Sequence, residues 1–390
     1  MRTFAKNLLA LSALAFVVIY FARLFPGMQE GLDFPHFYAA ARIVRDGRGR
    51  ELYDLQVQNQ YLARYSGREG IYFNHPPFET LIYLPFSFLP LSQAYALWSV
   101  FQACLLIATA WLLETSVLGR WSWRILLALF LLFAPVLLDF LQGQDSLLLL
   151  FLLTLAFVAL EQKKDFAGGG LAGCGLFKFH LAVPAVLPFL LAKPRKLAWG
   201  FASAAIVVLL VSVLISGWQV IVAYPRFLRQ LGSVPLAGIH DAQKANLRGL
   251  FGVMMPGAEN VAVVLTLLGS ALILGLTVHS ASLAGRNAGC ARLAFAQAVF
   301  GAILISYHLS PHDLSLLLLP MILLVDHLLL GENIPRATRL TLLLTLSVIY
   351  LPPLHLVLLR AHLYAYACLP VLVLFGVTFA EVRRMSAHSR

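Results

Sequence analysis

Long apolar runs recur along almost the whole chain, and they set the strongest limit on what it can fold into. A helix needs about 20 predominantly apolar residues to cross the hydrocarbon core of a bilayer. Runs of comparable length lie near residues 6–26, 91–113, 123–140, 145–161, 197–217, 260–279, 292–309, 313–330, 340–356 and 363–382. Hydrophobic residues make up 60% of the chain and charged residues only 12%, which excludes a soluble globular protein. The sequence therefore predicts one all-α polytopic membrane domain over residues 1–390, with the first run retained as a helix.

The net charge of +11 would suit a nucleic-acid-binding protein, but the placement of the charges argues against that class. Lysine and arginine occur as short groups at the ends of apolar runs, and they form no continuous stripe that could follow a phosphate backbone. The four cysteines lie within apolar segments without CxxC spacing, so neither a disulfide framework nor a thiolate metal site is expected. Membrane lipids are therefore expected partners, and nucleic acids are not.

Two apolar segments do not fit a simple membrane-spanning helix. Residues 76–90 form a short segment that contains four prolines, and residues 168–192 carry Lys178 and His180 in their middle. Basic residues flank the second segment on both sides, at Lys163 and Lys193 among others, and such residues favour the cytoplasmic side. The segment is therefore predicted to enter the membrane and return as a hairpin with Lys178 at its tip. The same rule makes 76–90 a re-entrant or interfacial element, and gives about 12 membrane segments when half-helices are counted.

This threading leaves two long external loops, 27–75 and 218–258, and it brings most polar clusters to the external face. Ionisable groups at the edges of membrane helices mark functional sites, because burying them is costly. A set of carboxylate, imidazole, ammonium and guanidinium groups suits a reaction with a base and an anionic leaving group. The polar residues collected there are Asp33, His36, Asn74, His75, Asp139, Gln142, Gln144, Asp145, Lys178, His180, Lys244, Asn246, Arg248, His308, His312 and Asp313.

Several of these residues also have a structural interpretation. Asp33 could cap a helix of the loop, Lys178 could extend its ammonium group to the membrane interface, and Arg248 could be a surface charge. Asp139 and Asp145 are expected to cap helices, with the Gln142-Gly143-Gln144 segment between them as a polar turn.

His308 and His312 lie four residues apart, a spacing that could place two metal ligands on one helical face. Ser310-Pro311 lies between them and argues against a continuous helix. A divalent metal is therefore possible but unsupported, and no cofactor is expected.

An ordered series of short motifs gives the chain a likeness to a known family. The motifs are Asp33-Phe34 with Phe37-Tyr38-Ala39-Ala40, Leu52-Tyr53-Asp54, Phe73-Asn74-His75-Pro76-Pro77, Leu84-Pro85, Leu89-Pro90, Gln142-Gly143-Gln144, Lys178 before a proline-containing run, Asn246-Leu247-Arg248-Gly249-Leu250 and Ser310-Pro311-His312. In this order and topology the chain resembles glycosyltransferase family 87, which comprises polyprenyl-phosphate-mannose-dependent mannosyltransferase-like enzymes of the membrane-embedded GT-C class. The resemblance implies a GT-C-like helical bundle with a large first external loop.

The resemblance also implies a reaction and roles for individual residues. Asp33 would be the general base of an inverting transfer of a sugar from a polyprenyl-phosphate donor to a lipid or glycan acceptor hydroxyl. The resemblance implies mannose as the sugar, because mannose is the family's default. The donor phosphate would be held by Lys178, Arg248, His312 and His308. The remaining substrate-binding candidates are His36, Tyr38, Asn74, His75, Gln144, His180 and Asn246. The expected location is a bacterial inner (plasma) membrane, with the active site facing the periplasm or exterior.

The main alternative class is a secondary transporter or lipid flippase, because broken helices with a lysine at the break also occur in transporters. Two observations argue against it: the hydropathy pattern has no evident internal repeat, and the polar groups cluster at one face. A non-catalytic membrane scaffold would leave the placement of Asp33, Lys178 and His312 at membrane boundaries unexplained.

Overall fold

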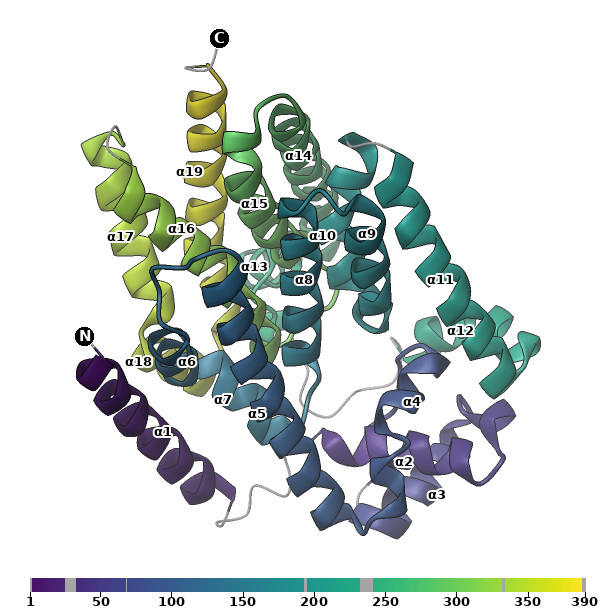
Figure 1. Cartoon of the computed structure of the whole chain (residues 1–390). Coiled ribbons are helices and arrows are strands. Elements are labelled where there is room, and N and C mark those ends of the chain that lie inside the picture. The colour runs from purple at the N-terminus through teal and green to yellow at the C-terminus, as the bar shows by residue number, and fades with distance from the viewer. Residues whose placement is uncertain are drawn as a thin grey trace.

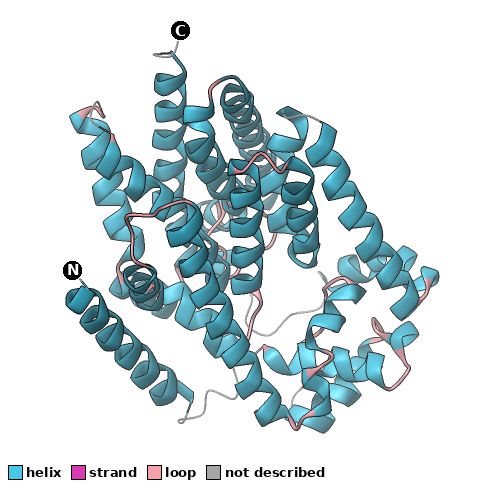
Figure 2. Ribbon diagram, in the orientation of Figure 1, coloured by secondary structure: helices cyan, strands magenta, loops and turns pink. Residues whose placement is uncertain are grey.

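The computed structural model describes residues 2–24, 33–67, 69–192, 195–231, 241–331 and 334–387, and these residues form helices and no strand (Figures 1 and 2). Seven of the described helices are long and apolar enough to cross a membrane, or up to nine if each of two bent helix pairs is one span. The predicted all-α polytopic membrane class is thus confirmed. The predicted number of about 12 membrane segments is not.

The described residues form nineteen α-helices and several short 3-10 turns, and Figure 1 labels the α-helices where there is room. The α-helices are α1 (Arg2–Leu24), α2 (Phe34–Arg45), α3 (Leu55–Ser66), α4 (Thr80–Tyr83), α5 (Leu91–Ser116), α6 (Trp123–Leu132), α7 (Ala134–Gln142), α8 (Ser146–Glu161), α9 (Asp165–Cys174), α10 (Phe179–Ala192), α11 (Arg195–Ser216), α12 (Trp218–Leu231), α13 (Leu247–Met254), α14 (Glu259–Arg286), α15 (Ala291–Ile305), α16 (Leu318–Leu330), α17 (Arg336–Tyr350), α18 (Pro352–Arg360) and α19 (Cys368–Ala387). The 3-10 turns are η2 (Gly49–Glu51), η3 (Pro77–Glu79), η4 (Phe86–Phe88), η5 (Gly175–Lys178), η6 (Asp241–Gln243), η7 (Ala288–Cys290), η8 (Pro311–Leu317) and η9 (Tyr364–Ala367).

The segment from α9 to α10 has the length and composition of a single span, but the chain reverses direction within it. A Cβ atom at Gly175 would lie 3.3 Å from the Cβ of Ala182. In a straight helix, residues seven apart are separated by about 10 Å along the axis. Asp165 and Ala192, at the two outer ends of the segment, also line one common cavity. The predicted hairpin is therefore confirmed, with η5 and Lys178 at its tip.

The proline-containing stretch 76–90 forms only the short elements η3, α4 and η4. None of them qualifies as a membrane span, as the sequence predicted. This stretch packs with α2, α3 and the start of α5 in an aromatic core of its own. Phe37 stacks on Tyr83 with ring centroids 4.5 Å apart, and the Tyr38 hydroxyl donates to the Leu89 carbonyl oxygen at 2.7 Å. The described part of the first predicted external loop is therefore a folded helical unit.

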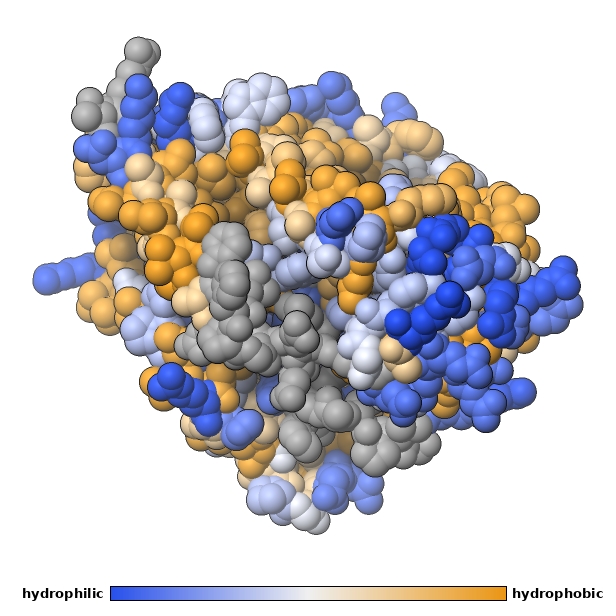
Figure 3. All heavy atoms as spheres, turned by 90° about the horizontal axis from the view of Figure 1, so that it is seen from below, coloured by the Kyte–Doolittle hydropathy of each residue, from blue (hydrophilic) through white to orange (hydrophobic). Residues whose placement is uncertain are grey.

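Basic residues that were predicted to lie on the cytoplasmic side meet at one end of the bundle. Arg120 forms an ion pair with Asp326, and Arg292 Nε lies 2.8 Å from Glu161 Oε2. The C-terminal end of α19 and the start of α17 lie toward the same upper end in Figure 1. Helices α2, α3 and α12 lie at the opposite end, which we call the pocket end. Seen from below, the pocket end has a broad hydrophilic area beside hydrophobic residues (Figure 3).

Candidate functional site

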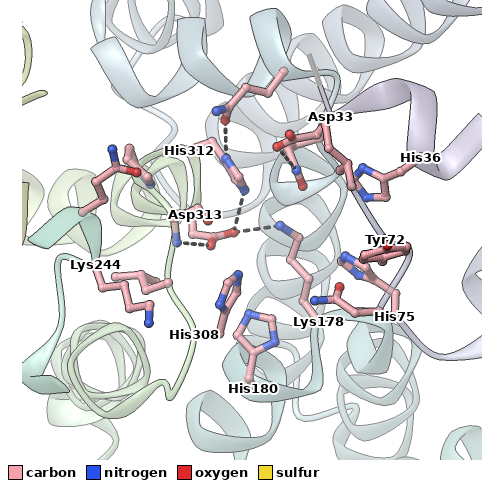
Figure 4. Close-up of a pocket in the computed structure, with 18 of the residues that line it drawn as sticks. Asp33, His36, Tyr72, His75, Lys178, His180, Lys244, His308, His312 and Asp313 are labelled. Atoms are coloured by element: carbon pink, nitrogen blue, oxygen red, sulfur yellow. Dashed lines mark hydrogen bonds and ion pairs between the residues drawn. The ribbon is translucent and has the colours of Figure 1, made fainter. Parts of the chain in front are cut away.

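A polar cavity of about 290 Å³ lies at the pocket end, where the α9–α10 hairpin tip, the end of α7, the turn η8 and the start of α2 meet. Figure 4 shows side chains from these separate elements directed toward one another. The cavity is lined by Asp33, His36, Gly70, Ile71, Tyr72, Asn74, His75, Gln142, Gln144, Lys178, His180, Gln243, Lys244, His308, Leu309, Ser310, Pro311, His312 and Asp313. Most of the site residues predicted from the sequence therefore converge on one place, although they are far apart in the chain.

Asp33 stands directly before α2, but its side chain makes no capping hydrogen bond to the helix. Its carboxylate Oδ2 instead accepts a hydrogen bond from Gln144 Nε2 at 2.6 Å. Its backbone N–H donates to the Gln142 carbonyl oxygen at 2.9 Å, which ties the start of α2 to the end of α7. The structural interpretation of Asp33 as a helix cap is thus wrong. The carboxylate is partly exposed and is held at the cavity wall.

The Gln142-Gly143-Gln144 segment is a turn that orients two site residues. Gly143 ends α7 with a φ of +67°, a conformation that glycine adopts without steric cost. A Cβ atom at position 143 would lie 2.6 Å from the Cβ of Phe34. Only glycine therefore allows Phe34, the residue after Asp33, to pack this closely against the turn. Gln142 Oε1 contacts His312 Nδ1, while Gln144 holds Asp33. The polar turn therefore connects the predicted base to the histidine of η8.

Lys178 lies at the floor of the cavity and is 2% exposed. Its ammonium nitrogen lies 2.7 Å from Asp313 Oδ1 and 3.1 Å from Asp145 Oδ1, and it donates to Ser146 Oγ at 2.9 Å. Figure 4 shows the lysine directed at Asp313. Two carboxylates thus neutralise the cation that the sequence predicted as a phosphate ligand. Burying an ammonium group requires such partners.

The two aspartates expected to cap helices differ in what they do. Asp139 accepts hydrogen bonds from the backbone N–H groups of Ser146 and Leu147, both at 3.3 Å, and so it does stabilise the start of α8. Asp145 occupies the N-cap position of α8 without a side-chain capping bond, and its carboxylate faces Lys178. The capping prediction is therefore wrong for Asp145. Asp145 supplies a counter-charge to the buried Lys178, and the sequence near Asp145 does not show that Lys178 is its partner.

Burial lowers the pKa of three cavity histidines outside the membrane-spanning segments, which are His36, His75 and His308. Burial lowers the pKa of His75 to about 4 and that of His308 to about 4, although nearby carboxylates act in the opposite direction. Burial also places the pKa of His36 well below its usual range. His180 completes the group, with its ring centroid 5.9 Å from that of His308. Neutral imidazoles can donate and accept hydrogen bonds, which suits the binding of hydroxyl and phosphate oxygens.

Three predicted site residues do not line the cavity. The Tyr38 hydroxyl belongs to the aromatic core described above. Asn246 caps α13 by accepting from the Gly249 N–H at 2.8 Å, and it donates to the Ser306 carbonyl oxygen at 2.7 Å. Arg248 is exposed, and its guanidinium reaches the Tyr307 carbonyl oxygen at 3.5 Å. Asn246 and Arg248 therefore contact backbone carbonyl groups of residues 306 and 307, next to the cavity residue His308.

The structure adds residues that sequence reasoning left out of the site. Asp313 accepts from Lys178 and Ser146 through one oxygen, and from the Ser310 N–H at 2.8 Å through the other. Lys244 and Tyr72 also line the cavity. Asp313 had a sequence signal, since it follows His312 at the edge of an apolar run. Among the described residues, no group of three or more His, Cys, Asp or Glu side chains has an arrangement that could hold a metal ion.

The bundle and its cavity define an integral membrane protein with a polar site at one end of its helices. A comparison with protein families identifies it further: the model of glycosyltransferase family 87 matches residues 73–311, which is more than half of the chain. The chain belongs to glycosyltransferase family 87. The matched range includes Lys178 and most of the cavity, but Asp33 and His36 precede it and His312 follows it. Searches of curated proteins and of solved structures found no match.

Proposed function

We propose that this glycosyltransferase transfers a sugar, mannose in the first instance, from a polyprenyl-phosphate donor to a hydroxyl group of a lipid or glycan acceptor, with inversion at the anomeric carbon. The reaction would take place on the external face of a bacterial plasma membrane. One observation carries the proposal. The Asp33 carboxylate is fixed by Gln144 at the wall of a cavity whose lining also includes imidazole, amide and ammonium groups.

In this mechanism Asp33 is the general base. Gln144 Nε2 holds Oδ2, and the carboxylate accepts the proton of the acceptor hydroxyl. The hydroxyl oxygen forms a bond to the anomeric carbon as the bond from that carbon to the phosphate oxygen breaks. The proton remains on Asp33, and the electron pair leaves with the polyprenyl phosphate. A single displacement of this kind inverts the configuration.

The developing charge on the leaving phosphate requires hydrogen-bond donors around it. His308 and His312, which lie just before and within η8, could donate through ring N–H groups, and Lys244 also lines the cavity. Lys178 would contribute from the floor, where Asp145 and Asp313 moderate its charge. Arg248 does not line the cavity, so as a phosphate ligand it would have to reach the donor from outside the cavity wall.

The lipid tail of the donor needs an apolar site next to the polar cavity. An apolar cavity of about 250 Å³ lies between α6, α16 and α17, with Leu318, Met321, Leu343 and Leu346 among its lining residues. Leu318 is the first residue of α16 and directly follows η8, which carries His312. We therefore place the first isoprene units of the tail in this cavity. Each buried CH₂ group stabilises binding by about 0.8 kcal/mol.

The test measures the transfer of radiolabelled mannose from polyprenyl-phosphate-mannose to membrane lipid by the purified protein. The rate of the wild type is compared with that of the Asp33→Asn variant. The asparagine keeps the size of the side chain but cannot accept the proton, so the rate should fall by about 10² to 10⁴-fold. Asp54→Asn is a matched control, because Asp54 caps α3 in the same helical unit and lies outside the cavity. Equal activity of Asp33→Asn and wild type would refute Asp33 as the base. Failure of the wild type with several polyprenyl sugars and acceptors would refute the proposed donor class.

A further inference from the structure

A buried acidic residue lies behind the cavity and has no role in the mechanism above. Glu79 ends η3, is 0% exposed, and does not line the cavity. It lies in the proline-containing stretch between the helical unit and α5. An ionised carboxylate at such a position is costly unless it is paired, so its protonation state needs an explanation.

Two contacts connect Glu79 to the cavity. Its Oε2 lies 3.0 Å from Nδ1 of His75, which lines the cavity. Its carboxyl group also interacts with the side chain of Asp145, which is likewise 0% exposed and contacts Lys178. Among the described residues, the four buried carboxyl oxygens of Glu79 and Asp145 have no hydrogen-bond donor apart from the His75 ring nitrogen and the Lys178 ammonium group, which lie at ion-pair distance. Glu79 therefore lies between a cavity histidine and the carboxylate that positions the cavity lysine.

Counting charges indicates that Glu79 holds a proton. Asp145 and Asp313 both contact Lys178, so these three groups already carry a net charge of −1 when all are ionised. A third ionised carboxylate beside Asp145 would be repelled by it. Burial, and next the Asp145 carboxylate, raise the pKa of Glu79 well above its usual range, while Lys178 acts in the opposite direction. The other titratable groups that face it are His75, Tyr53, Tyr83 and Tyr224.

We infer that Glu79 is a positioning residue: its neutral carboxyl group donates a hydrogen bond to Asp145 and accepts one from His75 Nδ1–H. The first bond keeps Asp145 directed at Lys178. The second fixes the tautomer of His75, so that its Nε2 lone pair is available to accept a hydrogen bond from a sugar hydroxyl. No bond is made or broken in this arrangement. The role in substrate binding rests on the proposed function, whereas the protonation state of Glu79 does not.

The competing arrangement is an ion pair between an ionised Glu79 and a protonated His75. It would need a positive imidazole at neutral pH, and burial lowers the pKa of His75 to about 4. It would also place two ionised carboxylates next to each other. The two arrangements bind the same number of protons, so pH dependence alone does not separate them. A neutral glutamine at position 79 reproduces the hydrogen bonds of the first arrangement but removes the charge of the second, so Glu79→Gln should keep the wild-type Tm at pH 5 only if Glu79 is neutral.

The experiment compares wild type with Glu79→Gln in thermal unfolding of the full-length protein in nanodiscs between pH 5 and pH 9. A carboxyl group with a raised pKa stabilises the fold at low pH and loses this contribution as pH rises toward the folded-state pKa. Gln does not titrate, so the Tm of Glu79→Gln relative to wild type should increase with pH by at least about 2 °C. Glu51→Gln is the control, because Glu51 is exposed and paired with Arg48, and its Tm difference should not increase. A flat difference for Glu79→Gln, or one that decreases with pH, would overturn the inference.

A second comparison tests the positioning role without relying on transfer activity. If Glu79 donates to Asp145, the Tm changes of Glu79→Ala and Asp145→Ala should not add in the double variant, since each substitution removes one partner of the same hydrogen bond. Additive changes would refute the contact. In the transfer assay, Glu79→Gln should retain most of the wild-type rate while Glu79→Ala loses about 10- to 100-fold. Equal rates of the two variants would refute the positioning role, and a wild type without activity would bear only on the proposed function.

Discussion

At the scale of single residues, the contact between Gln144 and Asp33 sets the orientation of the carboxylate that we propose as the base. The amide donates to Oδ2 at 2.6 Å and fixes the direction of the carboxylate. Gln144 is 6% exposed, so a substituted side chain stays next to Asp33. We predict that Gln144→Glu moves the acid limb of the kcat/KM profile to higher pH. Two adjacent carboxyl groups would share one proton, and Asp33 could not accept a proton from the acceptor hydroxyl until that shared proton had dissociated.

The matched control for this prediction is Gln144→Ala, which removes the orienting bond without adding a charge. It should lower kcat by about 10-fold and move the acid limb to higher pH by much less than Gln144→Glu does, because it removes one hydrogen bond without adding a neighbouring carboxyl group. The measurement is the rate of transfer as a function of pH for the three proteins. An unchanged profile for Gln144→Glu would mean that Asp33 is not the group whose ionisation limits the reaction.

Sequence reasoning could find the cavity residues that carry charge at the edge of an apolar run, and it could not find their partners. Asp33, Lys178 and His312 were identified because a polar group at a membrane boundary is costly. The ion pair between Lys178 and Asp313 joins residues 135 positions apart, and no local pattern encodes such a contact. For the same reason Asn246 was taken for a substrate ligand, whereas its amide caps α13 and contacts the Ser306 carbonyl.

At the scale of secondary-structure elements, two helices approach so closely that only glycine fits between them. A Cβ atom at Gly169 of α9 would lie 2.0 Å from the Leu197 carbonyl oxygen of α11, whereas one at Gly170 would lie no closer than 3.8 Å to a neighbouring atom. Small residues allow such backbone contacts in membrane proteins. We predict that Gly169→Ala forces the helices apart and lowers Tm by about 3 °C or more, while Gly170→Ala has little effect.

Thermal unfolding of the two variants in the same nanodiscs measures this difference. Both substitutions add one methyl group at neighbouring positions, so changes in helix propensity are the same for both. Equal Tm values for the two variants would show that α9 and α11 are not in close contact. The hairpin that α9 forms with α10 was predictable because basic residues flank it on both sides. The glycine contact was not, since the sequence does not say which helices are neighbours.

At the scale of the whole molecule, the positive-inside pattern and the order of the apolar runs predicted which segments meet at which end. They did so because charge controls orientation during membrane insertion. The number of spans was less predictable. Bends at Phe133 and Leu351 divide two apolar runs into helix pairs inclined by 73° and 57°. Such bends depend on the prolines at the start of α7 and α18, and on what packs around them.

The position of the apolar cavity beside η8 gives a prediction about the molecule and its lipid substrate together. Leu343 and Leu344 are consecutive residues of α17 and are 50% and 58% exposed, but only Leu343 lines the cavity between α6, α16 and α17. Leu343→Trp should obstruct the cavity and raise KM for a long-chain polyprenyl donor by about 10-fold or more, through the loss of buried tail area. Leu344→Trp should leave KM unchanged, because it adds the same bulk outside the cavity. With a short-chain donor analogue that does not reach the cavity, both variants should match wild type. An equal increase of KM in both variants, or an increase that does not depend on chain length, would place the tail elsewhere on the protein.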